Sequence, residues 1–232
     1  MPLGSKSSKK KARWFDVPVQ DMVLRVTGPD ELYEEARAAG LHFWEQLQSY
    51  GIRDPAFRTS KRPVTVPDDA PAIVREMAEA ATRAGVGPQY TFQGAITDHV
   101  GRFISLRAAD VLVSNGGDYF VITRKRSRLG VPIGGHEGQS LGIVVRPELG
   151  PHGIYTTAGR KQSPRDAADG LVVVASSCML ADAAAAAAGI VLRRSDSMAT
   201  TLEYLQGLEG VFGALVVQGR DVGVAGSLEL AA

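Results

Sequence analysis

The sequence contains a single cysteine, Cys178, and this scarcity excludes one class of protein. A disulfide framework within the chain needs at least two cysteines, so the fold must depend on its hydrophobic core, and a reducing compartment is expected. No apolar run approaches the roughly 20 residues that cross a bilayer. The first residues also lack the apolar region of a signal peptide. We therefore expect a cytoplasmic protein with no membrane partner.

The chain also lacks an excess of charge of either sign. Its 232 residues include 26 lysines and arginines and 25 aspartates and glutamates, which gives a formal net charge of +1. This balance creates no field that attracts nucleic acid, so no nucleic-acid partner is expected. A hydrophobic content of 44% is typical of a globular protein with a full core.

Several motifs of enzyme chemistry are missing. The histidines, which are His42, His99, His136 and His152, show no HxH or HExxH spacing, so no zinc site is expected. There is no GxSxG and no GxxxxGK[ST], which argues against a serine-hydrolase elbow and a P-loop. Cys178 has no CxxC partner, and a buried hydrophobic role is favoured over a nucleophilic one.

The organisation of the chain predicts one domain over residues 15–232 behind a basic tail over residues 1–14. Lys6–Arg13 reads KSSKKKAR, which favours a solvated, disordered end over a contact with an anionic partner. Met1–Ser5 resemble a remnant of a cloning vector. No repeat of fixed period and no clear linker divides the rest. A homo-oligomer formed through the long first helix is a further expectation.

The spacing of apolar residues predicts interspersed helices and strands. Helices are predicted over 30–50 with a stop at Gly51, from Ala70–Pro71 to a left-handed cap at Gly85, over 93–103, and over 179–188 with a break at Gly189. Strands are predicted over 17–26, 141–145 and 171–175, a hairpin over 211–230, and irregular segments over 53–71 and 130–138. Since no regular βαβ spacing appears, the predicted fold class is α+β.

The stretch Val111–Ile122 carries the most information about function. Two short apolar runs are joined by Asn115-Gly116-Gly117-Asp118, which predicts a strand pair with a turn of positive φ and exposed backbone N–H groups. Glycines would let a ligand approach the main chain, and Asp118 could then hold a ribose, a metal or a substrate amine. An ordinary hairpin is the alternative.

Further candidate site residues lie elsewhere in the sequence. Arg165 follows the Thr156-Thr157 pair, and its forked guanidinium would suit a carboxylate or phosphate, with a solvated basic loop as the alternative. Asp169 is either an acid–base group or an anchor for the strand that follows. His99, in a predicted helix, is either a general base or a surface histidine.

Several segments, in order, resemble a family of uncharacterised bacterial and archaeal proteins related to the flavin transferase ApbE. The matching segments are Asp54-Pro55-Ala56-Phe57, Ala70–Met77, Ala84–Pro88, Gly94-Ala95-Ile96, Asn115–Asp118, Gly153–Thr157, Ala168-Asp169-Gly170 and Ala181-Asp182-Ala183. Together they cover roughly residues 15–230. No single segment is specific, but their order and spacing support an ApbE-like fold.

This resemblance implies that the Gly-Gly-Asp turn and the Ala-Asp helix start face one cleft. In the transferases that cleft holds FAD, and a magnesium ion near the diphosphate promotes transfer of FMN to a protein threonine. Asp182 corresponds to a ligand of that metal. The transferases place a threonine four residues later, where this chain has Ala186, whose methyl group donates no oxygen.

A second departure follows Gly87-Pro88. The relatives usually carry small apolar residues there, whereas this chain has Gln89, Tyr90, Thr91, Phe92 and Gln93, which we expect to line a substrate site. With Asn115, Gly116, Gly117, Thr156 and Thr157 they form the predicted substrate-binding set, and Asp118, Arg165, Asp169 and His99 form the predicted catalytic set. A retained scaffold with an altered ligand is expected.

Three functional hypotheses follow from the sequence. The favoured one is an enzyme that acts on a small anionic or aromatic acid by hydrolysis or another cofactor-free step, with Arg165 on the acidic group. The second is a magnesium-dependent FAD:protein FMN transferase. The third is a non-catalytic protein that binds a flavin, a nucleotide or another metabolite. No cofactor is assigned, and magnesium or FAD enters only with the alternatives.

Overall fold

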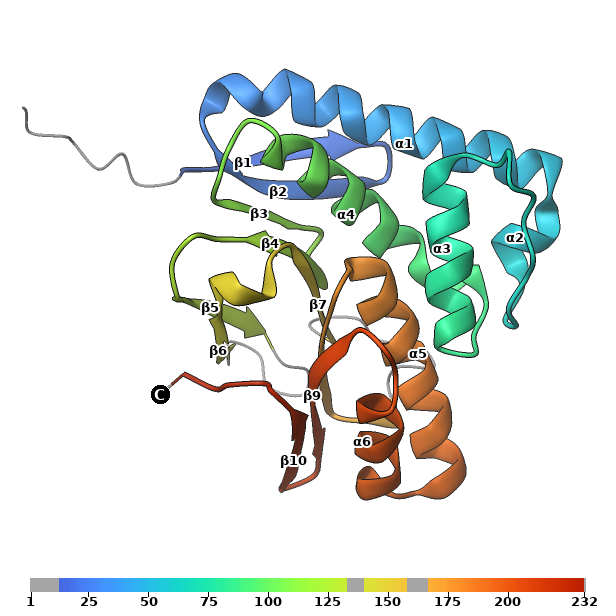
Figure 1. Cartoon of the computed structure of the whole chain (residues 1–232), viewed down its shortest axis with the longest axis vertical. Helices are drawn as coiled ribbons and strands as arrows, with labels where there is room; N and C mark the ends of the chain where they lie inside the picture. The colour runs from blue at the N-terminus through green and yellow to red at the C-terminus, as the bar shows by residue number, and fades with distance from the viewer. Residues whose placement is uncertain (1–12, 133–139, 158–166, 232) are drawn as a thin grey trace, which may run out of the picture.

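The computed structural model describes residues 13–132, 140–157 and 167–231. Within these ranges an eight-stranded antiparallel sheet has the strand order β1-β2-β3-β4-β7-β8-β9-β10, and β5 and β6 form a separate two-stranded sheet. The α-helices pack on one face of the large sheet and the small sheet on the other (Figure 1). The predicted α+β class is confirmed.

The strands are β1 (Arg13–Val19), β2 (Met22–Gly28), β3 (Val111–Ser114), β4 (Asp118–Ile122), β5 (Ser127–Pro132), β6 (Ser140–Val145), β7 (His152–Thr156), β8 (Gly170–Ala175), β9 (Val211–Gln218) and β10 (Asp221–Gly226). The helices are α1 (Tyr33–Arg53), α2 (Pro55–Thr59), α3 (Ala72–Arg83), α4 (Phe92–Ser105), α5 (Cys178–Ser195) and α6 (Met198–Gln206). Short 3-10 turns are η1 (Asp30–Leu32), η2 (Pro88–Thr91) and η3 (Pro147–Leu149). None of the helices in the described ranges is long and apolar enough to span a bilayer.

Strand β8 shows why the centre of the large sheet lacks the polar alternation of an exposed strand. Leu171 and Val173 pack into the core beneath the helices, whereas Val172 and Val174 pack against the small sheet. A strand that is covered on both faces needs apolar residues at every position. The continuous valine run is the result.

The N-terminal region corrects the prediction of one strand over 17–26. The chain forms a hairpin, in which Val19 pairs with Met22 across a turn at Gln20 and Asp21. Gln20 has φ of 55°, a left-handed conformation that is uncommon for residues other than glycine. No glycine or asparagine signals this turn, so the sequence pattern concealed it.

Of the predicted helix ends, the one at Gly85 is confirmed, and those at Gly51 and Gly189 are wrong. Gly85 has φ of 62° directly after α3, which confirms the left-handed cap. Gly51 and Gly189 do not stop their helices, since α1 continues to Arg53 and α5 to Ser195. At Gly51 the reason is packing, because a Cβ there would lie 2.1 Å from Cδ of Arg58, so the glycine accommodates that side chain.

Two segments predicted to be irregular contain regular structure. The segment 53–71 includes α2, which begins where Asp54 Oδ1 accepts a hydrogen bond from the Ala56 N–H. The segment 130–138 begins within β5, and its remaining residues, with His136 and Glu137, lie outside the described residues. Strand β1 includes Arg13 and Trp14, which the prediction assigned to the tail.

Helix α5 begins directly against the large sheet, and a glycine makes this approach possible. A Cβ added at Gly153 of β7 would lie 2.1 Å from the backbone nitrogen of Cys178 and 2.2 Å from the carbonyl carbon of Ser177. Both are backbone atoms, which cannot rotate away as a side chain can. The position of the α5 start therefore depends on the missing side chain at Gly153.

We predict that Gly153→Ala lowers the free energy of unfolding by about 3 kcal/mol, because the new methyl group overpacks the contact between β7 and α5. Gly28→Ala is the matched control, since its Cβ would meet Leu32 at an ordinary 3.5 Å and should change stability by less than about 1 kcal/mol. Urea unfolding of both variants checks this. Equal stability of the two would contradict the tight contact.

Candidate functional site

The β3–β4 turn is held in shape by the side chain of Asn115. Asn115 Oδ1 accepts hydrogen bonds from the N–H groups of Gly117 (3.0 Å) and Asp118 (2.8 Å). Asn115 Nδ2 donates to Asp118 Oδ2 (2.5 Å) and to Thr97 Oγ1 on α4 (3.0 Å). The carboxyl group of Asp118 is fully buried under this turn. The hairpin is thereby tied to α4.

The sequence suggested that this turn exposes free backbone N–H groups, but the structure shows that it does not. The N–H groups of Gly117 and Asp118 bind Asn115, and the Gly116 N–H donates to Ser114 Oγ (3.1 Å). What the glycines do provide is open backbone. Gly116 has φ of 92°, and a Cβ there would meet no atom within 4 Å. A ligand can therefore approach the main chain closely but finds no anion-binding cradle in these three N–H groups.

The two predicted threonines lie beside the turn. The Thr156 N–H on β7 donates to the carbonyl oxygen of Gly117 (2.8 Å). The next residue, Thr157, bonds to the start of β8, with its Oγ1 accepting from the Leu171 N–H (3.1 Å). Thr156 is fully buried and Thr157 nearly so. The structure therefore brings Asn115, Gly116, Gly117, Asp118 and both threonines together.

Asp182 connects the helices α4 and α5. Its Oδ2 accepts a hydrogen bond from the backbone N–H of Gly94 (2.9 Å), in the first turn of α4, and its side chain is buried. A helix N-terminus stabilises a carboxylate through its unpaired N–H groups and its dipole. Gly94 permits the contact, since a Cβ there would lie 2.7 Å from Asp182 Oδ2 and 2.7 Å from the carbonyl oxygen of Cys178.

Cys178 is the point at which the separate segments meet. Burial raises the pKa of its thiol well above the usual range, and the charges of Asp98, Asp118 and Asp182 raise it further. The thiol therefore stays protonated, in agreement with a buried hydrophobic role. The hydrogen bonds of Gly94 to Asp182 and of Asn115 to Thr97 tie both α5 and the glycine turn to helix α4.

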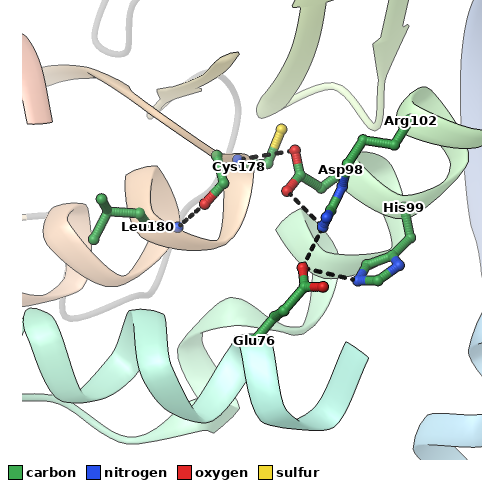
Figure 2. Close-up of polar contacts among 7 residues, drawn as sticks. Glu76, Asp98, His99, Arg102, Cys178 and Leu180 are labelled. Carbon is green, nitrogen blue, oxygen red and sulfur yellow. Dashed lines mark hydrogen bonds and ion pairs between the residues drawn. The ribbon is translucent and has the colours of Figure 1, made fainter. Parts of the chain in front are cut away.

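A charged cluster that sequence reasoning missed lies next to Cys178. Figure 2 shows Arg102 of α4 between Glu76 of α3 and Asp98, with Asp98 reaching the start of α5. Arg102 Nη2 lies 3.3 Å from Asp98 Oδ2, and Asp98 Oδ1 accepts from the Cys178 N–H (3.3 Å). The spacing of Asp98 and Arg102, four residues apart, is a helical pair that the sequence did contain. The partner Glu76 carried no such signal.

The pKa values in this cluster diverge. Burial raises the pKa of Asp98, and the charge of Arg102 and the Cys178 N–H offset this only in part. Burial also acts to raise the pKa of Glu76, but hydrogen bonds from His99 and Arg102 outweigh it and lower that pKa to about 2. Two carboxyl groups with opposite shifts around one guanidinium are a feature of functional sites as well as of structural ion pairs.

The cluster borders a cavity of 220 Å³, which Glu76, Asp98, Arg102, Phe120 and Met179 help to line. The predicted general base His99 does not reach the β3–β4 turn through any contact that the structure gives. Its Nε2 lies 3.4 Å from Glu76 Oε2, and its ring packs against Phe43 at a centroid distance of 4.7 Å.

The remaining predicted site residues are dispersed. Asp169 is exposed, and its Oδ2 accepts a hydrogen bond from the Gly219 N–H (2.6 Å) in the β9–β10 turn. Thr91 is buried, with its hydroxyl on the Pro88 carbonyl (2.9 Å), and Tyr90 packs against α5. Gln93 is exposed, and its carbonyl accepts from Thr97. Gln89 and Phe92 line a different cavity. Arg165 lies outside the described residues.

The described residues contain no group of three or more His, Cys, Asp or Glu side chains that could hold a metal ion. Asp182 Oδ2 already accepts the Gly94 N–H, and Ala186, one helical turn later, provides no oxygen. Magnesium prefers an octahedral shell of oxygen atoms. Among the described residues, the side chains around Asp182 do not form such a shell.

Comparison with known proteins identifies relatives along nearly the whole chain. A family model described as "AbpE bacteria" matches residues 7–202. A UPF0280 protein of Methanopyrus kandleri is 33% identical over 215 residues, which cover 89% of this chain and 86% of the relative. A UPF0280 protein of Methanosphaerula palustris is 34% identical over 204 residues, which cover 84% and 82%.

Two solved structures have the same fold. The apo flavinyl transferase ApbE of Pseudomonas stutzeri aligns with a TM-score of 0.57 at 14% identity and covers 95% of this chain and 94% of its own. An ApbE protein of Thermotoga maritima aligns with a TM-score of 0.58 at 12% identity, covering 95% and 97%. At these identities the likeness concerns the fold.

We predict that Glu76→Gln lowers the free energy of unfolding at pH 7 by about 1 kcal/mol. The folded pKa of about 2 lies below the ordinary 4.5, so ionised Glu76 stabilises the fold above pH 4.5 and loses this effect as the pH falls toward 2. Because the side chain is 35% exposed, solvent screening reduces the effect to this small value. The difference from the parent protein should shrink by more than half at about pH 3.

The control is Glu79→Gln, on the same helix and paired with Arg83 at 2.5 Å, but 61% exposed. We expect it to change stability by less than about 0.5 kcal/mol at either pH. Urea unfolding at both pH values compares the two variants. If both variants lose the same free energy of unfolding at pH 7, the predicted stabilisation by ionised Glu76 is disproved.

Proposed function

This chain belongs to the family described as AbpE bacteria, and on that basis we propose that the site at the β3–β4 turn takes FAD and transfers its FMN half to a hydroxyl group of an acceptor protein. The observation that carries the proposal is that helix α4 binds both the glycine turn, through Thr97 and Asn115, and Asp182, through the Gly94 N–H. A protein named a flavinyl transferase shares this fold, and this favours FAD over the small anionic or aromatic acid as the substrate.

The open backbone at Gly116 is the feature that suits a flavin. A planar ring system can lie against main chain that has no side chain above it, and the φ of 92° keeps larger residues away from this position. Asn115 fixes the turn, and Thr97 fixes Asn115 from α4. The ring would therefore meet a surface that is rigid before binding, which lowers the entropic cost of association.

The proposed reaction is a substitution at phosphorus. The acceptor hydroxyl oxygen attacks the phosphorus atom of the FMN half, the bond between that phosphorus and the bridging oxygen breaks, and AMP leaves as the hydroxyl proton is released. The product is a phosphoester between FMN and the acceptor. Asp118 and Asp182 hold in place the turn and the α4 start, against which the flavin ring lies.

The metal ion that the transferases use does not fit the described residues of this chain. Asp182 is the only member of the expected ligand pair, because Ala186 replaces the second. Its Oδ2 also accepts a hydrogen bond from the α4 N-terminus. This difference favours a second candidate function, in which the same site binds a flavin nucleotide without transferring FMN.

We predict that FAD binds to the purified chain and that incubation with threonine-containing peptides adds the mass of FMN to a peptide and releases AMP. Mass spectrometry of the peptides and chromatography of AMP measure transfer, and flavin fluorescence measures binding. Asp118→Asn should lower the transfer rate at least tenfold, because it disturbs the carboxyl group that holds the turn. Reactions with magnesium and with EDTA test the metal requirement.

Asp110→Asn serves as the control, since Asp110 forms an exposed ion pair with Arg124 (3.0 Å) and should leave transfer unchanged. Circular dichroism and urea unfolding show whether each variant is folded. Binding of FAD without any peptide adduct would select the binding function over transfer. Absence of both binding and adduct would reject the proposed function.

A further inference from the structure

A second cavity, of 330 Å³, is lined by residues of α1, α2, the η2–α4 junction and the β1–β2 turn, and none of its lining residues belongs to the β3–β4 turn. We call it the aromatic pocket. The side chains that matter for its chemistry are Trp44, Phe92, Gln48, Gln89, Arg58 and Asp21. Its volume is within the range of sites that hold small molecules, and its lining combines aromatic rings with a few polar groups, as such sites do.

Aromatic rings form the walls of the pocket. Trp44 and Phe92 meet edge to face, with a centroid distance of 5.1 Å and an interplanar angle of 83°. Phe57 is buried behind them and is supported by the Tyr50 ring at 5.1 Å. Trp44 and Phe92 are only half-buried, so they have ring surface left for a ligand. Such walls favour a flat ligand that can stack.

The polar groups of the pocket are available for a ligand. Four polar side chains of the pocket form no hydrogen bond or ion pair with any described residue. They are those of Gln48, Gln89, Arg58 and Asp21. Each carboxamide can both donate and accept, the guanidinium donates, and the carboxylate accepts. A ligand that satisfies all four needs a ring edge with donors and acceptors, an anionic group and a further donor.

The fold fixes the backbone positions of the two charged residues, Arg58 and Asp21. The stem of Arg58 packs over Gly51 of α1, and α2, which carries Arg58, begins at the Asp54 cap. Asp21 follows Gln20, whose left-handed φ of 55° closes the two-residue turn. Positions that are held in this way lose little freedom when a ligand binds.

We propose that the aromatic pocket binds a purine mononucleotide. The base stacks on Trp44, the carboxamides of Gln48 and Gln89 bond to its edge, Arg58 binds the phosphate, and Asp21 accepts from the ribose hydroxyl groups. A glutamine carboxamide matches the adjacent donor and acceptor of adenine. An aromatic carboxylic acid would use the rings and Arg58 but would leave both carboxamides and Asp21 without partners.

This inference does not rest on the proposed flavin transfer. None of the residues that line the aromatic pocket takes part in the hydrogen bonds of the β3–β4 turn or of Asp182. The mononucleotide could be free AMP or the adenylate half of FAD, since both have the same chemistry at the pocket. Asp118→Asn separates the two proposals, because it should leave the affinity for AMP unchanged.

Tryptophan fluorescence provides the test. The chain has two tryptophans, and Trp14 lies on β1 with the Arg25 guanidinium 5.3 Å from its ring, so Trp14→Phe leaves Trp44 as the only reporter. We predict that AMP quenches Trp44 fluorescence with saturation and binds more tightly than adenosine. Arg58→Ala should weaken AMP about tenfold and leave adenosine unchanged. Gln89→Leu should weaken both ligands by a similar factor.

The matched control is Arg53→Ala, a cation on α1 that stacks on Tyr50 at 4.8 Å and does not line the aromatic pocket. It should leave AMP binding unchanged. Titration with FAD shows whether the pocket also binds the adenylate group when it is part of FAD. The proposal is overturned if millimolar AMP causes no saturable quenching, if adenosine and AMP bind equally, or if indole-3-acetate binds and AMP does not.

Discussion

The hydrogen bond between the Gly94 N–H and Asp182 holds the candidate site together. It joins the N-terminus of α4 to α5 inside the protein, where a carboxylate without a partner would cost several kcal/mol. The same helix α4 carries Thr97, which fixes the β3–β4 turn through Asn115, and Asp98, which accepts the Cys178 N–H at the start of α5. The position of one helix therefore determines both the glycine turn and the charged cluster.

This arrangement also limits what the glycine turn can bind. Its N–H groups are used within the turn, by Asn115 and Ser114, and the carboxyl group of Asp118 is buried beside them. Among the described residues, the three N–H groups of this turn offer a phosphate no free donor. The uncharged ring of a flavin, in contrast, gains from close contact with bare backbone. The physical match at Gly116 is to the ring of the nucleotide.

The sequence pattern predicted those features that depend on neighbouring residues. The three-four spacing over 30–50, the left-handed Gly85 and the strand pair around Asn115 are confirmed because each follows from local backbone preferences. The order of short motifs also identified the family correctly. The β1–β2 turn escaped prediction because Gln20 adopts a left-handed φ that its side chain does not favour.

Long-range contacts were beyond sequence reasoning for a different reason. Asp98 and Cys178 are eighty residues apart, and nothing in the spacing of either indicates a hydrogen bond between them. The sequence analysis expected Gln89 to Gln93 to line one substrate site, but the structure disperses their side chains. A short turn followed by a helix sends neighbouring side chains in different directions, so Tyr90 reaches α5 while Gln89 and Phe92 reach Trp44.

That divergence explains how one scaffold can provide two binding surfaces with opposite character. The side of α4 that faces α5 is acidic and tightly packed, and three aspartates act there on a thiol that stays protonated. At the N-terminal end of the same helix, Phe92 packs against Trp44 at the aromatic pocket, where the Arg58 guanidinium has no partner among the described residues. The carboxylates of Asp118 and Asp182 repel an anionic group, whereas Arg58 in the aromatic pocket can bind one. For a nucleotide with a neutral ring and charged phosphates, electrostatics therefore direct the phosphates away from Asp118 and Asp182 and favour a cationic partner such as Arg58.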